Sequence, residues 1–202
     1  MKLAIFFFLT SLLHANFSYF ETHKLDAFED FKIYAPKGTY LQDNINYKKG
    51  HLSQINKEQL NKLYSHEKMV RDLLLVLSKK YDYNFMQYVA MLTHTQLLTL
   101  NMFYKKYNLS KPENLKYVGK FNNKNIKKRY EVLLQDSLKE KKIAAKLSVV
   151  FMKELVTMYN KTSKNLPRDL KRQLLKTNAF NKKILRMFKK GLRNIELGLP
   201  VE

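Results

Sequence analysis

Apolar side chains recur every three or four positions between residues 56 and 80, which is the period of one face of an α-helix. Asn56 stands three positions before Gln59, the spacing of a capping box, so we expect the helix to begin there. The inward positions are Leu60, Leu63, Glu67, Val70, Leu74 and Leu77. Because Glu67 is the one charged residue among them, the pattern predicts a carboxyl group in the core.

A second helix of the same period is expected from Asn84, which precedes Gln87 by three positions, to about Asn108. The residues YDY at 81–83 leave a short loop before it, so the two helices should run antiparallel. The inward positions of the second helix are Phe85, Val89, Leu92, Gln96, Leu100 and Phe103.

The second half of the chain predicts further helices after a turn-rich connection at 109–123. A helix in the segment IKKRYEVLLQDSL, 126–138, should turn Ile126, Tyr130, Leu133 and Leu134 inward. A third long helix has an expected inward stripe of Ile143, Leu147, Val150, Glu154 and Met158. Pro167, which the first turn of a helix tolerates, should start a short segment ending at Thr177. The last helix is marked by Leu185, Phe188, Leu192 and Ile195.

These patterns amount to four long helices and two short accessory ones, with no convincing strand. They predict an all-α protein, an antiparallel four-helix bundle that occupies residues 55–197.

The N-terminal residues have the layout of a secretory signal peptide. Lys2 is followed by an apolar run that is too short to span a bilayer, and the small residue Ala15 follows. We expect cleavage near Ala15 and a periplasmic or secreted protein, with an uncleaved N-terminal anchor as the alternative. Residues 16–54 should form an irregular arm with a short helix near 20–31, and no later stretch is apolar enough for a transmembrane span.

Composition adds a strong positive charge to this picture. The 38 Lys and Arg against 17 Asp and Glu give +21, or +20 once Lys2 leaves with the signal peptide, and the chain has no Cys to form disulfides. Such a charge favours anionic partners such as lipid headgroups, lipopolysaccharide or acidic glycans. The composition of an AT-rich genome is the alternative source of the lysines. The strongest cationic face lies on the last helix, with Lys182, Lys183, Arg186, Lys189, Lys190 and Arg193 as candidate anion-binding residues.

Other binding and catalytic classes lack sequence support. The Lys- and Tyr-containing stretch 116–130 resembles no RNA-binding signature, so we do not expect nucleic-acid binding. No glycine-flanked nucleophilic serine and no phosphate-binding glycine loop occur, so we do not expect an enzyme of those classes.

Glu67 and Glu154 are the candidate metal ligands. Helix bundles that bind two metal ions project carboxylates and histidines inward from facing helices. Two inward carboxylates on separate helices are a minimum for such a site, and they make a residual metal centre one hypothesis for the function.

Three short motifs carry a resemblance to a known family. EKMVRD (67–72), VGKFNN (118–123) and GLRN (191–194) resemble, in the same order, motifs of the domain of unknown function 2202, a bacterial branch of the ferritin-like superfamily. The resemblance covers about residues 55–197 and implies a ferritin-like four-helix bundle. It also implies that the metal-ligand positions are degenerate, because Thr93 and Gln96 stand where the family has Glu-x-x-His and Ile195 stands where it has a closing His.

With those ligands replaced, we expect no metal and no cofactor. Glu67 should then pair with Arg71 or meet Thr93, Gln96 or a Tyr across the core. Glu154 should pair with Lys146, Lys153 or a neighbouring helix, and His94 should point away from Thr93. The sequence therefore predicts a non-catalytic exported structural or interaction module. It leaves open whether the partner is another exported protein or an envelope component. A cationic protein that binds anionic envelope components, or a residual metal-binding protein, are the alternatives.

Overall fold

The computed structural model describes residues 49–199, and this part of the chain is an all-α helical bundle without strands. Its helices are α3 (Gln54–Tyr81), α4 (Asn84–Lys106), α5 (Lys124–Ser137), α6 (Lys141–Thr162), the single-turn η3 (Ser163–Asn165) and α7 (Arg168–Glu196). The predicted signal peptide, most of the arm and the short helix near 20–31 lie outside the described residues.

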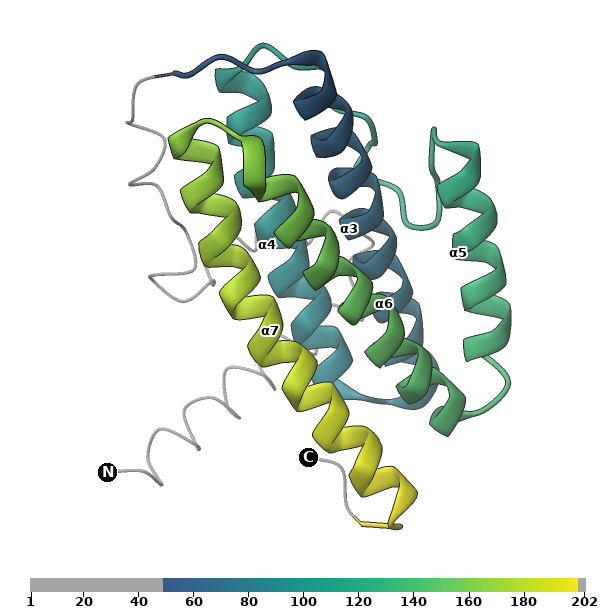
Figure 1. Ribbon diagram of the computed structural model, residues 1–202. Helices are drawn as coiled ribbons and strands as arrows, with labels where there is room; N and C mark the ends of the chain where they lie inside the picture. Colours follow the sequence, from purple (N-terminus) through teal and green to yellow (C-terminus); the bar gives the residue numbers. More distant parts are fainter. Residues whose placement is uncertain (1–48, 200–202) are drawn as a thin grey trace, which may run out of the picture.

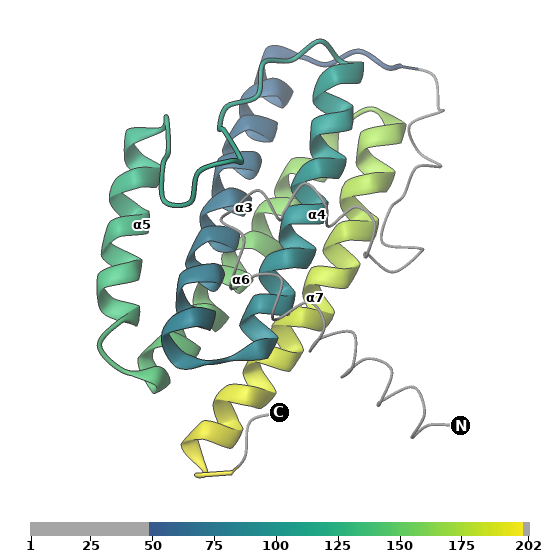
Figure 2. The same ribbon diagram turned by 180° about the vertical axis from the view of Figure 1, so that it is seen from behind.

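Four long helices form the bundle and α5 lies outside it (Figure 1). The helices α3 and α7 run in one direction and α4 and α6 run in the opposite direction, as the view from behind also shows (Figure 2). The helix α5 packs on α3 and α6, and the connection 107–123 crosses from the end of α4 to its start. The predicted antiparallel four-helix bundle is confirmed, and one of its long connections carries the accessory helix.

The core is built from the predicted faces of α3 and α4. The side chains of Leu63, Val70, Leu74 and Val89 are fully buried. Among residues 49–199, no helix is both long and apolar enough to cross a membrane.

The helix starts differ from the predicted ones by a few residues. The α3 helix is capped by Ser53, whose hydroxyl accepts the Asn56 N–H at 3.2 Å, so Asn56 lies inside the helix. The Asn56 side chain is buried and donates to the carbonyl of Asn165 instead. Asn84 is the first residue of α4 rather than its cap.

The predicted boundary between the short segment ending at Thr177 and the last helix is wrong. The segment from Pro167 to Thr177 and the last helix are one continuous helix, α7. Pro167 precedes its first turn, where the missing N–H has no acceptor to lose. No helix-breaking residue follows before Gly191, so nothing in the sequence ends the helix at Thr177.

The inward face of α6 is also different from the predicted stripe. The buried positions are Ala144, Ala145, Ser148, Phe151, Met152, Leu155, Val156, Tyr159 and Thr162. Val150, expected in the core, exposes 45% of its surface. The whole stripe is therefore rotated by about one residue, and this rotation moves Glu154 out of the core.

Candidate functional site

The Glu67 carboxyl group lies at the centre of the bundle, fully buried on α3. The Tyr159 hydroxyl, from α6, donates to it and lies 2.8 Å from both carboxyl oxygens. The expectation of a Tyr partner across the core is thus confirmed. The expected pairing with Arg71 is wrong, because the Arg71 guanidinium donates to Asp72 and to the carbonyl of Leu115.

Burial raises the pKa of Glu67 to about 8, and the hydrogen bond from Tyr159 opposes this rise only in part. Desolvation also raises the pKa of Tyr159, and the adjacent Glu67 raises it further. At neutral pH the pair is therefore a carboxylic acid beside a phenol, with no net charge in the apolar core.

Thr93 and Gln96 of α4, the other expected partners of Glu67, form hydrogen bonds elsewhere. The Thr93 hydroxyl donates to the carbonyl of Val89 within its own helix. Gln96 donates to the side-chain oxygen of Asn181 on α7 at 3.0 Å. The α7 residue opposite Gln96 is thus Asn181. Ile195 follows it by 14 positions, or about 21 Å along the helix, in the half-buried last turn.

Glu154 lies at the surface, which contradicts its predicted place in the core. Its carboxylate accepts two hydrogen bonds from the Arg129 guanidinium of α5, with both side chains partly exposed. The expected pairing with a neighbouring helix is confirmed. Lys146, another expected partner, instead lies 4.0 Å from Glu196. The two candidate metal ligands therefore do not face one another.

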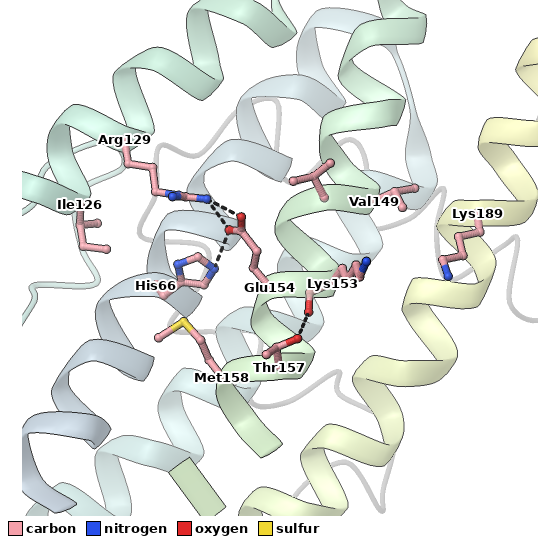
Figure 3. A pocket seen from close by; sticks show the side chains of 10 residues that line it. His66, Ile126, Arg129, Val149, Lys153, Glu154, Thr157, Met158 and Lys189 are labelled. Carbon is pink, nitrogen blue, oxygen red and sulfur yellow. Dashed lines mark hydrogen bonds and ion pairs between the residues drawn. The ribbon is translucent and has the colours of Figure 1, made fainter. Parts of the chain in front are cut away.

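His66 forms part of the floor of an open groove over α6, next to Glu154 (Figure 3). Its Nε2 lies 3.8 Å from a Glu154 oxygen, and the residue exposes 5% of its surface. Burial lowers the pKa of His66 to about 4, and the Arg129 charge adds to this effect, while a hydrogen bond to the Phe151 backbone opposes it. His66 is thus neutral at physiological pH.

A buried ion network on α3 was missed by the sequence reasoning. The Lys68 ammonium donates to Asp72 at 2.6 Å and to the carbonyls of Tyr117 and Lys120. Asp72 also accepts the backbone N–H of Gly119 at 2.9 Å. Burial lowers the pKa of Lys68, and the ion pair with Asp72 opposes that shift.

Arg71 completes the network. It donates to Asp72 and to the Leu115 carbonyl, and its Nη1 lies 2.9 Å from Nδ1 of His94. Since a guanidinium can only donate, His94 accepts through Nδ1. His94 thus points away from Thr93 toward α3 and the connection, as the helical geometry predicted.

The same connection is held at a second point by Glu113. This buried carboxylate accepts the Ser65 hydroxyl at 3.0 Å and the Asn122 N–H at 2.7 Å. At the first point, Gly119 adopts φ +71°, and a Cβ there would lie 3.2 Å from the Tyr130 ring. We use the name loop clamp for Lys68, Arg71, Asp72 and Glu113 together with the connection that they hold.

The loop clamp joins two of the motifs that carried the resemblance. Lys68, Arg71 and Asp72 come from EKMVRD, and Gly119 and Lys120 come from VGKFNN. The signal in the sequence was the cluster of three charges beside Glu67 on a helix with many buried positions. It could have been interpreted as a buried network only with the position of the connection known.

The six candidate anion-binding residues are all exposed on α7. They are Lys182, Lys183, Arg186, Lys189, Lys190 and Arg193. The opposite side of the same helix turns Ile184 and Phe188 into the core, where each exposes 2% of its surface. The cationic face is therefore available, while the apolar face is used by the bundle.

Comparison with known proteins gives a family and a fold. The model of the family described as "Uncharacterized protein domain (DUF2202)" matches residues 56–195. No curated protein matches the chain. The crystal structure of hypothetical protein MJ0754 from Methanococcus jannaschii DSM 2661 is similar with a TM-score of 0.71 and 22% identity. The match covers 75% of this chain and 87% of that one, and at this identity it shows the fold alone.

Proposed function

The chain belongs to the uncharacterised DUF2202 family, and from this premise we propose that it is an exported, non-catalytic ferritin-like module that has lost a di-metal site. In this proposal a neutral Glu67–Tyr159 pair takes the central place of the bundle, and the protein acts through its shape and surface.

The single observation that carries the proposal is the pairing of the buried Glu67 carboxyl with Tyr159. A di-metal centre in a helix bundle takes about four carboxylates and two imidazoles, and the carboxylates must be ionised to bind the metal. Here the core carboxyl is protonated at neutral pH and engages a phenol. Gln96, a position where the resemblance implies a ligand, donates to Asn181 instead. No group of three or more His, Asp or Glu suited to a metal ion occurs within residues 49–199.

Metal loading tests this proposal. We expect the purified protein, after incubation with Fe(II), Mn(II) or Zn(II) and desalting, to retain no stoichiometric metal by elemental analysis. Its melting temperature should not rise with the metal, because a ligand that binds only the folded state would raise it. Retention of one or two ions per chain, lost in Glu67→Gln but kept in the surface control Glu131→Gln, would overturn the proposal.

A second candidate function is binding to anionic envelope surfaces. The observation that favours it is the cationic face that the six exposed candidate residues form on α7, on a chain with a formal charge of +21. Contacts of this kind form with phosphate or carboxylate groups and weaken with salt.

Sedimentation with anionic and with neutral vesicles tests this candidate. Charge reversal at Lys182, Arg186 and Lys190 should weaken binding to anionic vesicles and reduce its salt dependence. The matched control reverses three exposed lysines of α3, Lys62, Lys79 and Lys80. Equal losses in the two variants would mean that net charge alone acts, and this result would remove α7 as the site.

A further inference from the structure

The open groove over α6 combines an apolar wall with charged ends (Figure 3). It encloses about 830 Å³, within the roughly 300–1,000 Å³ usual for small-molecule sites. Its apolar lining comes from α5 and α6, and Val150 contributes a side chain with 45% exposure. The apolar lining residues are Ile126, Val149, Val150 and Met158.

The charges in the groove are unevenly distributed. At the α5 end, Glu154 is bound by Arg129 through two hydrogen bonds, and the neighbouring His66 is neutral. At the α7 end, Lys153 and Lys189 point into the space between α6 and α7 (Figure 3). Neither ammonium group forms an ion pair with a carboxylate in the part of the chain that the structure describes. The groove thus has two uncompensated positive charges at one end.

We propose that this groove binds a single-chain anionic amphiphile, a medium-chain fatty acid, with its carboxylate between Lys153 and Lys189 and its chain over Val149 and Val150, one helical turn before Lys153. Charge complementarity decides the orientation, because the paired Glu154 at the other end offers a carboxylate no attraction. Apolar area decides the class, because a chain laid over the two valine side chains removes them from water. The groove shares Lys189 with the cationic α7 face, but the proposal rests neither on vesicle binding by that face nor on the loss of the metal site.

Isothermal titration of the purified full chain with decanoate, below the concentration at which it forms micelles, tests the proposal. We expect saturable 1:1 binding that weakens by up to about fourfold for each methylene removed down to octanoate. The neutral amphiphile decyl maltoside, whose alkyl tail is one methylene longer, should bind at least tenfold more weakly, since no anionic head meets the two ammonium groups.

Two pairs of variants locate the site. Lys153→Glu with Lys189→Glu should weaken decanoate binding about tenfold or more, because two attractive contacts become repulsive. The matched control, Lys182→Glu with Lys183→Glu, makes the same change in net charge on exposed α7 residues outside the groove lining and should leave the affinity within about twofold. Val150→Gln changes a half-exposed wall residue and should weaken binding without loss of helix content by circular dichroism.

The outcomes separate the possibilities. Absence of decanoate binding, equal binding of decyl maltoside, or equal losses in the two charge-reversed variants would each overturn the proposal. If anionic vesicles bind wild-type protein but decanoate does not, the α7 surface stands and the groove site fails. If decanoate binds and vesicles do not, the groove stands and the α7 surface fails.

Discussion

The substitution Glu67→Gln should make the protein more stable at neutral and alkaline pH. Glutamine resembles the protonated Glu67 in shape, and its carbonyl can accept the hydrogen bond from Tyr159 that the carboxyl group accepts. The difference is that glutamine never ionises. The folded wild-type protein must either keep Glu67 protonated or bury its charge. The unfolded chain has neither constraint, because its Glu67 is free to ionise in water.

The size of the effect follows from the two pKa values of Glu67. Its ordinary value is 4.5, and in the folded protein burial raises it to about 8. Below pH 4.5 both states are protonated and Glu67 favours neither. Between pH 4.5 and 8 the unfolded chain releases the proton first, so the folded state loses about 1.4 kcal/mol per pH unit. The loss amounts to about 3 kcal/mol at pH 7 and about 5 kcal/mol above pH 8.

Urea unfolding followed by circular dichroism at pH 5, 6, 7, 8 and 9 measures this difference. The free energy of unfolding of Glu67→Gln minus that of wild type should rise from pH 5 to pH 8 and then level off. Glu131→Gln, at an exposed position of α5, is the matched control and should follow wild type at every pH. Parallel curves for wild type and Glu67→Gln would show that Glu67 is ionised in the folded protein, and the neutral-pair explanation would be wrong.

Three further predictions concern the surroundings of this pair. Asp72→Asn should destabilise the protein by about 3–5 kcal/mol, because it leaves the buried Lys68 charge unpaired. Hydrogen exchange at the Gly119 amide should also accelerate, because that amide donates to Asp72. Unchanged exchange would mean that the loop clamp does not hold the connection. The His66 ring should show no titration in NMR spectra above about pH 5, since burial lowers its pKa to about 4, and a midpoint near 6.5 would contradict its burial. Arg129→Gln should lower the free energy of unfolding by less than about 1 kcal/mol in thermal melts, because this ion pair is partly exposed; a larger loss would show that the groove depends on it.

The sequence was sufficient for most of the fold because α3 and α4 each have one unambiguous apolar face. On α6 it was not, because two stripes with helical spacing overlap there. One contains Ile143, Leu147 and Val150, and the other contains Ser148 and Tyr159. Both stripes are apolar, and the second, which also contains Phe151, Met152, Leu155 and Val156, lies inside. The small residues of the second stripe let helices approach closely, and Tyr159 has a hydrogen-bond partner in the core. Both effects depend on other helices, so the local sequence does not reveal them.

The same dependence on distant residues decided which parts of the candidate site could be predicted from the sequence. Glu67 could be placed in the core from its period alone, but its partner Tyr159 is 92 positions away. The cations of α7 were correctly placed on an exposed face, because they alternate with apolar residues at helical spacing. Lys68 and Asp72 were overlooked because charges on a helix are usually solvated. Their burial depends on the connection that folds over them, which has no periodic pattern.

The segment EKMVRD therefore contains two separate devices. On a helix, Lys68, Arg71 and Asp72 point between about 40° and 140° away from Glu67, so one stretch serves the core and the connection at once. The core device needs a partner on α6, whereas the clamp joins α3 to the connection and, through Arg71 and His94, to α4. A substitution at Thr93 or Gln96, which bond to Val89 and Asn181, changes the core and removes no hydrogen bond of the clamp. Likeness to the family in this segment is then explained by folding alone, and it argues for the bundle without arguing for a metal.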